Sequence, residues 1–371
     1  MKKLSVFLYS MGAGGAERVV SNLLPFLTQK YEVHLFLMSD VVSYEIPNSV
    51  KFHFLEHSNP NENKIKKMFR LIFALPFLAF KYKKISNNLG INSHFVLMNR
   101  PCYIALISRI FGLKGRLIIS ERSCPSMIYK KGINGFFNRA FIRLLYNKAD
   151  LILANAKENA DDLIQNFGCD KDKTKVFYNA IDLKSIQKLK NEPLGIDFKP
   201  FFLNIGRLDS GKNQSMLIKI IANLKDKRAT LGILGDGYMK DELLSLIKKH
   251  KVDDRVKLLG VDKNPFKYIK NSSCFVCASR FEGFSNVLLE ALACEKTIIS
   301  TSHKSGAKEL LGDNEYGLLV DVDDEKAMQE AMQNILDNEE LRYKYESRAY
   351  ERVKKFDSDI ISLKLIEFLE Q

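Results

Sequence analysis

The sequence has no run of apolar residues long enough to cross a bilayer as a helix. The longest candidate, "LIFALPFLAF" at 71–80, is about half of the roughly 18 residues required, and it contains Pro76. The N-terminal "MKKLSVFLYSMGAGG" begins with charge, but its apolar run is short and leads straight into a glycine-rich loop. We therefore expect a first β-strand here and no targeting segment.

The sequence also lacks a disulfide framework. Its six cysteines are scattered over 371 residues, which fits a reducing cytoplasm better than secretion. Cys274 and Cys277 form a C-x-x-C, but no second Cys/His pair stands at zinc-site spacing. The run "SSCFVCASR" reads as a short apolar strand, so we expect no metal site there.

Neither of the common phosphate-binding glycine motifs is present. In "MGAGGAERVV" the glycines Gly12, Gly14 and Gly15 match neither G-x-G-x-x-G nor the P-loop. They separate a strand-like run from a segment of helical period. Glycine-rich backbone at a helix N-terminus can hold an anion, and it can equally be a tight turn. Both interpretations are open on these residues alone.

What the sequence does contain is alternation between apolar strand-like runs and segments of helical period. This pattern predicts α/β units on parallel sheets, and it occurs twice, on either side of a polar break at 178–200. We expect two Rossmann-like doubly wound domains facing a central cleft, with ligands at the C-terminal ends of the strands. The predicted domains are 1–180 and 199–355, and a last helix, 356–371, is expected to cross back to the first.

Two cations follow the first strand of the second half. "FFLNIGRLDSGKNQ" places Arg207 directly after a strand and Lys212 five residues later, with Gly206 and Gly211 relaxing the backbone. A planar guanidinium and a mobile ammonium can together neutralise a diphosphate without metal. The alternative is that both are surface residues of a loop.

Two carboxylates follow a later strand, in "SRFEGFSNVLLEALAC". Glu282 is predicted to lie in a loop and Glu290 in the helix that follows it. Eight residues of helix span about 12 Å, which is too far for an acid–base pair acting on one glycosidic bond. We interpret them as residues that hold two hydroxyl-bearing parts of one long ligand.

These motifs together resemble the retaining, GT-B-fold glycosyltransferases of family 4. The resemblance rests on "GGAER" at 14–18, "GRL" at 206–208, Lys212 and Glu282-x7-Glu290, in this order over nearly the whole chain. It implies that Arg207 and Lys212 bind the diphosphate of a nucleotide sugar and stabilise the leaving group. It also implies that Glu290 holds the ribose and Glu282 the transferred sugar.

The resemblance extends to the remaining donor contacts. It implies catalytic roles for Glu282, Arg207 and Lys212, and no metal cofactor. Further donor-binding residues are implied at the following positions: Gly14, Gly15, Gly283, Phe284, Ser285 and Asn286. The acidic "DVDDE" at 321–325 is interpreted as the N-terminus of a helix, not as a metal-binding D-x-D.

One departure from the family pattern concerns the reacting sugar. Many members have a histidine after the strand that corresponds to "LIISERS", whereas Ser120, Glu121, Arg122 and Ser123 stand here. Glu121 and Arg122 are therefore candidates for contact with the reacting sugar, with no catalytic role assigned.

The formal net charge of +13 is concentrated in part around 61–88, where basic residues flank a ten-residue apolar centre. The basic residues concerned are Lys64, Lys66, Lys67, Arg70, Lys81, Lys83 and Lys84. A basic, apolar surface helix favours an anionic membrane surface or a lipid-diphosphate headgroup, and the alternative is a buried helix with solvated ends. The sequence has no nucleic-acid-binding module, so nucleic acid is not an expected partner.

Within family 4, "YNAIDL", "GRLDSGKN" and "HKSGAKEL" are similar to bacterial N-acetylgalactosaminyltransferases that build the glycan for N-linked protein glycosylation. The resemblance implies UDP-N-acetylgalactosamine as donor and an undecaprenyl-diphosphate-linked oligosaccharide as acceptor, extended by an α-1,4 linkage at the cytoplasmic face of the inner membrane. Alternatives are a polymerising transferase of that pathway, a lipopolysaccharide or capsule transferase, and a non-catalytic nucleotide-sugar-binding protein. No residue selects the sugar.

Overall fold

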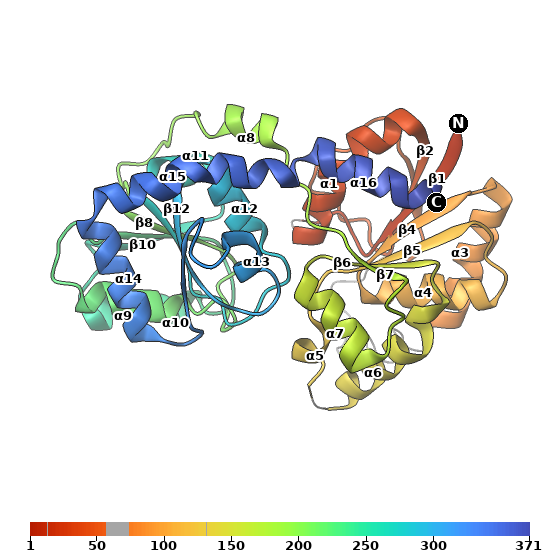
Figure 1. Ribbon diagram of the computed structural model, residues 1–371, viewed down its shortest axis with the longest axis horizontal. Helices are drawn as coiled ribbons and strands as arrows, with labels where there is room; N and C mark the ends of the chain where they lie inside the picture. The colour runs from red at the N-terminus through yellow and green to blue at the C-terminus, as the bar shows by residue number, and fades with distance from the viewer. Residues whose placement is uncertain (13, 57–73, 131) are drawn as a thin grey trace. The chain divides into compact units, whose positions relative to one another are not determined.

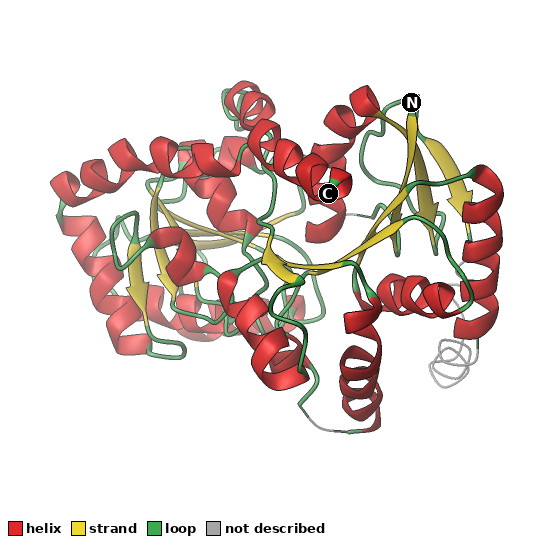
Figure 2. Ribbon diagram, turned by 45° about the vertical axis from the view of Figure 1, so that its right-hand side comes forward, coloured by secondary structure: helices red, strands yellow, loops and turns green. Residues whose placement is uncertain are grey.

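The computed structural model describes residues 1–12, 14–56, 74–130 and 132–371 and divides the chain into two compact units (Figure 1). The first unit comprises residues 1–180 and 358–371, and the second comprises residues 181–357. Each unit is built around a parallel sheet with helices on both faces (Figure 2). The predicted fold class of two doubly wound α/β domains is confirmed.

The sheet of the first unit has seven strands in the order β3-β2-β1-β4-β5-β6-β7. The strands are β1 (Lys2–Leu8), β2 (Tyr31–Leu37), β3 (Lys51–Phe54), β4 (Ser93–Leu97), β5 (Arg116–Glu121), β6 (Leu151–Ala154) and β7 (Thr174–Val176). The helices are α1 (Gly15–Lys30), α3 (Leu75–Leu89), α4 (Asn99–Ile110), α5 (Pro125–Ile128), α6 (Ile133–Leu145), α7 (Lys157–Phe167) and α16 (Ser358–Glu370), with a 3-10 turn at Tyr146–Lys148.

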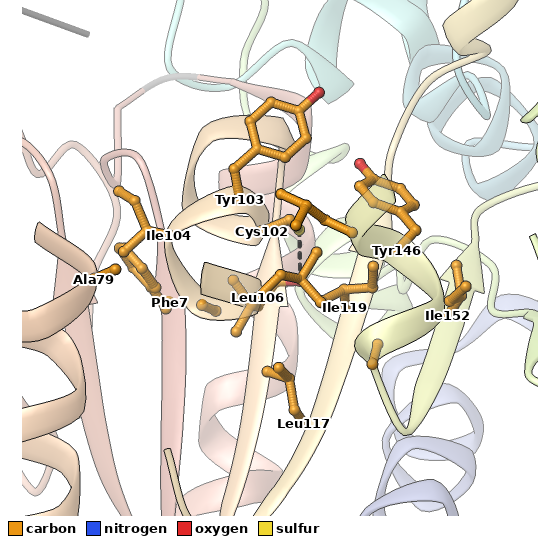
Figure 3. Close-up of a cluster of buried hydrophobic side chains, with 14 of the residues drawn as sticks. Phe7, Ala79, Cys102, Tyr103, Ile104, Leu106, Leu117, Ile119, Tyr146 and Ile152 are labelled. Atoms are coloured by element: carbon orange, nitrogen blue, oxygen red, sulfur yellow. Dashed lines mark hydrogen bonds between the residues drawn. The ribbon is translucent and has the colours of Figure 1, made fainter. Parts of the chain in front are cut away.

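The strands of this sheet are apolar on both faces because helices cover both. On β1, Leu4 and Val6 pack with α1 and α16, whereas Phe7 points to the other face and packs with α3 and α4. Figure 3 shows this second face, where Phe7 lies beside Ala79 of α3 and Ile104 of α4. Continuous burial of this kind explains why the strands read as apolar runs and not as an alternating pattern.

The sheet of the second unit has six strands in the order β10-β9-β8-β11-β12-β13. The strands are β8 (Phe202–Ile205), β9 (Leu231–Leu234), β10 (Val256–Gly260), β11 (Cys274–Cys277), β12 (Thr297–Thr301) and β13 (Leu318–Val320). The helices are α8 (Leu183–Leu189), α9 (Gln214–Asn223), α10 (Lys240–His250), α11 (Phe266–Asn271), α12 (Asn286–Ala293), α13 (Ala307–Leu311), α14 (Glu325–Asp337) and α15 (Glu339–Val353), with a 3-10 turn at Lys354–Phe356.

Two local predictions can be compared directly with these elements. The C-x-x-C forms strand β11, and both cysteines are buried with free thiols, as the strand interpretation predicts. The break at 178–200, expected to be a linker, contains α8. Gln187 of α8 donates to Ala293 O at 3.0 Å, and Lys190 pairs with Glu295 at 2.7 Å, so this segment packs onto the second unit.

No helix within the described ranges combines the length and the hydrophobicity that a membrane span requires. The apolar run at 71–80 lies partly outside the described residues and continues into α3.

Candidate active site

The second sheet has a topological switch point between β8 and β11. In the sheet, β8 has the next strand of the chain, β9, on one side and the later strand β11 on the other side. Loops that leave neighbouring parallel strands in opposite directions open a crevice at the C-terminal edge, where α/β proteins bind ligands. The loop that carries Arg207 and Lys212 follows β8, and the loop that carries Glu282 follows β11. The topology therefore brings these three residues to one edge.

Close backbone packing shapes the loop after β8. Gly235 has a φ of +153°, and a Cβ at this position would lie 1.9 Å from Gly206 O, so only glycine fits. Gly206 in turn lies under the aliphatic part of Lys212, because a Cβ there would be 3.2 Å from Lys212 Cε. The chain thus seats the lysine stem against the backbone. In contrast, the side chain of Arg207 is 83% exposed, and its Nη2 lies 3.3 Å from Asp209 Oδ2.

Lys212 and Glu282 form an ion pair in the centre of this edge. Lys212 Nζ donates to Glu282 Oε1, and the same oxygen accepts from Ser279 Oγ at 2.8 Å. Thr301 of β12 holds Ser279 in place by donating to its carbonyl oxygen at 2.5 Å. The two side chains are 18% and 15% exposed, so the pair is mostly buried but open to a ligand.

Each charge of this pair shifts the pKa of the other group so that both stay ionised despite their burial. Burial by itself raises the pKa of Glu282, but the positive charges of Lys212 and of protonated His303 outweigh burial and lower the pKa. Burial lowers the pKa of Lys212, yet the Glu282 charge raises it overall. Both groups are therefore charged at neutral pH.

His303 is a member of this cluster that sequence reasoning missed. It lies just after β12, is 1% exposed, and donates through Nδ1 to Lys304 O at 3.2 Å. Burial lowers its pKa, but the Cys277 thiol and the Glu282 carboxylate beside it raise the pKa overall. The sequence could have indicated His303 through its position, because it closely follows the apolar strand that comes after the Glu282 loop. Ligands in α/β proteins bind at such C-terminal strand ends.

Helix α12 begins directly after the Glu282 loop. Ser285 is its N-cap residue, and the Ser285 hydroxyl makes no cap hydrogen bond and has no partner among the described residues, although it is buried. Such an orphaned hydroxyl at a helix N-terminus suits a ligand with hydrogen-bonding groups. Glu290 lies in α12 as predicted and is 4% exposed.

The other predicted residues of this stretch fall around the same helix start. Gly283 precedes it in the loop, and Asn286 is its first residue. Phe284 is 3% exposed and packs against Phe356 at 5.4 Å between ring centroids, so its side chain belongs to the core. A role for Phe284 at a ligand is thus confined to its backbone.

Polar contacts of Arg280 and Asp323, which we call the Arg280–Asp323 bracket, join the loop of Lys212 to the segment that precedes Glu282 and to the 321–325 run. Arg280 Nε donates to Asp323 at 2.7 Å, and Arg280 Nη1 donates to Ser210 O at 2.8 Å. The Arg280 amide also donates to Gly211 O at 2.8 Å, while Asn213 Nδ2 donates to Asp323 at 3.0 Å. The Lys212 loop is therefore held by Arg280, which stands two residues before Glu282, and by Asp323.

This bracket also accounts for the acidic run at 321–325. Asp323 pairs with Arg280, and Asp324 caps α14 by accepting from the Ala327 amide at 2.9 Å. Asp321 accepts from Ser302 Oγ at 3.2 Å. The interpretation of this run as a helix N-terminus is confirmed. Within the described ranges no group of three or more His, Cys, Asp and Glu side chains is arranged to hold a metal ion.

In the first unit, the glycine-rich loop follows β1 at the switch point between β1 and β4. Gly14 is the N-cap of α1, and Gly15 begins the helix. A Cβ on Gly14 would overlap the Glu17 carboxylate, and the Gly14 carbonyl accepts from Tyr44 OH at 3.2 Å. A larger residue here would therefore require the Glu17 side chain to move. An additional role in binding phosphate stays a prediction.

Glu121 lies at the end of β5 with its carboxylate turned into the protein. It accepts from Tyr146 OH at 2.8 Å, from Asn99 Nδ2 at 3.0 Å and from Ser123 Oγ at 2.7 Å. Burial raises the pKa of Glu121 despite these hydrogen bonds. Its side chain is 1% exposed, which favours a structural role over contact with a sugar.

Arg122 is held beside it by three neighbours. It donates to Ser120 Oγ at 3.2 Å and to Asn179 Oδ1, and its carbonyl accepts from Asn155 at 3.0 Å. Burial lowers the pKa of Arg122 to about 10 even with Glu121 adjacent. The guanidinium remains charged at neutral pH, and its contact with a reacting sugar stays a prediction.

The basic segment 61–88 is only partly described. Lys64, Lys66, Lys67 and Arg70 lie outside the described residues. In α3, Lys81 donates to Leu55 O at 2.9 Å, and Lys83 lies 5.6 Å from the Phe80 ring centroid. Lys84 is exposed, as are Phe77 and Phe80 at 70% and 53%. The described part of α3 is thus a helix with one side in the core and an apolar, basic outer side.

Comparison with known proteins identifies the class. A model of glycosyltransferase family 4 matches residues 13–185, and a model of group 1 glycosyl transferases matches residues 185–352. The molecule is therefore a glycosyltransferase built from two Rossmann-like units. The chain belongs to glycosyltransferase family 4.

Two curated relatives from Campylobacter jejuni match over the full length. One, N-acetylgalactosamine-N,N'-diacetylbacillosaminyl-diphospho-undecaprenol 4-alpha-N-acetylgalactosaminyltransferase, is 50% identical over 370 residues and 100% of both chains. The other, a GalNAc-alpha-(1->4)-GalNAc-alpha-(1->3)-diNAcBac-PP-undecaprenol alpha-1,4-N-acetyl-D-galactosaminyltransferase, is 30% identical over 99% of this chain and 98% of the relative.

Solved structures share the fold at low identity. HepE from Anabaena, in complex with UDP and glucose, has a TM-score of 0.80 at 20% identity over 100% of both chains. Sucrose-phosphate synthase from Thermosynechococcus elongatus has a TM-score of 0.84 at 17% identity, over 100% of this chain and 99% of that one.

Proposed function

We propose that this enzyme transfers N-acetylgalactosamine from UDP-N-acetylgalactosamine to an undecaprenyl-diphosphate-linked saccharide and forms an α-1,4 linkage. The observation that carries the proposal is 50% identity over the full length to a transferase whose name states that sugar, linkage and lipid carrier. A polymerising transferase is the second candidate, and the relative named for transfer to a longer saccharide is 30% identical. The first reading therefore has the stronger support.

The second unit offers the chemistry that such a donor needs. A nucleotide sugar carries two phosphates, a ribose and a sugar, so its site needs cations in the middle and hydroxyl-binding groups at both ends. Lys212 and the exposed Arg207 supply the cations. Glu282 and Glu290 supply carboxylates on either side of the α12 N-terminus.

The ion pair suggests how the donor engages the site. When a diphosphate arrives, Lys212 turns from Glu282 toward a phosphate oxygen, and Glu282 becomes available to accept from sugar hydroxyls. The Ser279 hydroxyl keeps Glu282 in place during this exchange. As the bond between the sugar and the diphosphate breaks, the lysine and arginine charges stabilise the negative charge that develops on the leaving UDP. The departing phosphate accepts the proton of the acceptor hydroxyl, so sugar and proton are both transferred on one face.

The proposed anionic partners agree with the charge of the chain, since the formal net charge is +13 and the acceptor carries a diphosphate. The enzyme would work at the cytoplasmic face of a membrane, where the undecaprenyl chain is anchored. In this proposal Arg207 and Lys212 neutralise the diphosphate, and no metal cofactor takes part.

Release of UDP tests the proposal with a panel of donors. The purified enzyme is given a synthetic lipid-linked disaccharide that ends in N-acetylgalactosamine, together with UDP-N-acetylgalactosamine, UDP-N-acetylglucosamine, UDP-galactose or UDP-glucose. We expect acceptor-dependent UDP release with the first donor at least about 100 times faster than with the others. Equal rates with all donors, or no acceptor-dependent release at all, would contradict the proposal. Repeated addition to one acceptor molecule would favour the polymerising transferase.

A further inference from the structure

Helix α6 carries large apolar side chains on the side that faces solvent. Ile133, Phe136 and Leu144 are 70%, 70% and 71% exposed, and Phe137 is 40% exposed. Their spacing places all four on one stripe of the helix, opposite Ile142, which is fully buried. We call these four side chains the outer α6 face. In Figures 1 and 2, α6 lies at the edge of its unit.

The outer α6 face lies in a strongly basic stretch of sequence. Residues 125–148 contain five Lys or Arg and no Asp or Glu. Arg139 and Arg143 follow one flank of the stripe, Lys130 precedes the helix, and Lys148 follows it, and the two lysines and Arg143 are exposed. Soluble proteins rarely expose several large apolar side chains together without a partner. An apolar stripe with basic flanks is the pattern of helices that lie in the surface of an anionic bilayer.

We infer that the outer α6 face is the surface through which this enzyme sits on an anionic lipid bilayer. The inference rests on the proposed function, because an undecaprenyl-linked acceptor presents its diphosphate and sugars at such a surface. The charge pattern argues against pairing of two copies through this face, since that would bring the basic flanks of both copies together, and residues 125–148 contain no acidic residue to oppose them. In the bilayer, the phenylalanine and aliphatic side chains enter the headgroup region and the basic residues meet lipid phosphates.

This surface differs from the one that the sequence indicated. The segment 61–88 was expected to contact the membrane, and in its described part α3 exposes Phe77, Phe80 and Lys84. The exposed α3 side chains are therefore the alternative membrane-binding surface, and the same experiment tests them.

Flotation with phospholipid vesicles tests the inference. The full chain is mixed with vesicles of phosphatidylcholine with or without about one third phosphatidylglycerol. The variant Ile133→Ser/Phe136→Ser/Leu144→Ser is compared with a matched control, Ile360→Ser/Leu363→Ser on α16, whose side chains are 51% and 57% exposed. Because the replaced residues are exposed, both variants are expected to keep the wild-type melting temperature.

We expect the α6 variant to lose at least about 100-fold in partitioning to anionic vesicles, since each large apolar side chain contributes on the order of tenfold. The α16 control keeps wild-type binding. Lys130→Gln/Arg143→Gln weakens binding to anionic vesicles by about 25-fold, at roughly 5-fold per charge, and leaves binding to neutral vesicles unchanged.

Transfer assays separate this inference from the proposed function. The α6 variant is expected to act at the wild-type rate on an acceptor with a short, water-soluble lipid and to lose activity on undecaprenyl-linked acceptor in vesicles. Wild-type vesicle binding by the α6 variant would overturn the inference, and so would a loss that follows Phe77→Ser/Phe80→Ser alone. A wild-type dimer that the α6 substitutions convert to a monomer would also overturn it. Vesicle binding without transfer to either acceptor would refute the proposed function and leave the membrane surface standing.

Discussion

Replacement of Lys212 by methionine perturbs the centre of the donor site with little change in shape. Methionine is unbranched and fills the space over Gly206, but it removes the charge, so the Glu282 carboxylate loses its ion partner. Breaking a buried pair in this way typically costs about 3–5 kcal/mol. Since the two side chains retain 18% and 15% exposure, we take the lower end, about 3 kcal/mol.

That cost is measurable as a shift in the melting temperature. The second unit, residues 181–357, has the size for which 1 kcal/mol shifts Tm by about 2–4 °C, so we expect a loss of about 6–12 °C. The matched control is Lys219→Met on α9, an exposed lysine whose replacement should move Tm by less than about 2 °C. The double variant Lys212→Met/Glu282→Gln removes both charges and should recover part of the loss.

The effect of the substitution depends on pH in a defined direction. The pKa of Glu282 is lowered from its ordinary value of 4.5, so its contribution to stability is present above that value and disappears as the pH falls through the lowered pKa. The pKa of Lys212 is raised from 10.5, so its contribution is lost only as the pH rises through the raised pKa. The difference in Tm between wild type and Lys212→Met should therefore be constant near neutral pH and vanish in acid.

Transfer measured on the same proteins gives the second readout. Removing one charge that stabilises the leaving group is expected to slow transfer at least about 100-fold. A Lys212→Met enzyme with the wild-type Tm and the wild-type rate would refute both the ion pair and the diphosphate role. A normal rate with a lowered Tm would refute the diphosphate role alone.

Four further substitutions test three separate parts of the account. Arg280→Met and Asp323→Asn should each raise the KM for the donor about tenfold by loosening the Lys212 loop, with no further increase in the double variant. Glu290→Gln should weaken UDP binding in calorimetry by about tenfold or more, because a charged acceptor is lost at the predicted ribose site. Glu121→Ala should lower Tm, since it leaves buried donors without an acceptor at about 1–3 kcal/mol for each group.

Each of these has a result that would contradict it. An unchanged donor KM in Arg280→Met and Asp323→Asn would show that the loops hold their places without this contact. The Asp226–Arg228 pair, in which Arg228 is exposed and Asp226 half-buried, supplies a control in which Asp226→Asn leaves the kinetics unaltered. Wild-type UDP affinity in Glu290→Gln would remove the ribose assignment. Loss of transfer by Glu121→Ala at the wild-type Tm would place Glu121 at the reacting sugar.

Much of the fold was predictable because buried parallel strands are continuous apolar runs. The strand-like apolar runs contain most of the strands, whereas β3, β7 and β13 lie outside such runs. These three are short, of three or four residues, and β3 has exposed or half-buried side chains. Their pairing is decided by the neighbouring strand, and local sequence does not encode it. The helix α8 was missed because its surroundings are polar and contain proline and glycine.

The site was predictable to the level of loops and strand ends. Lys212 and Glu282 were assigned from their positions after strands and from family resemblance. Their direct ion pair was not predicted, because residues 70 positions apart meet only through the strand order of the sheet. The same holds for Arg280 and Asp323, which look like ordinary charged loop residues in the sequence. His303 stands after an apolar strand, and the strand order shows that this strand neighbours β11.

The product of one defined reaction tests the central claim most directly. The enzyme is incubated with UDP-N-acetylgalactosamine and an undecaprenyl-diphosphate-linked disaccharide that ends in N-acetylgalactosamine, and the released glycan is analysed by mass spectrometry and NMR. We predict a gain of a single N-acetylhexosamine per acceptor, in α linkage to O4 of the terminal sugar. An unchanged acceptor, or a product that carries a hexose in place of N-acetylgalactosamine, would contradict the account.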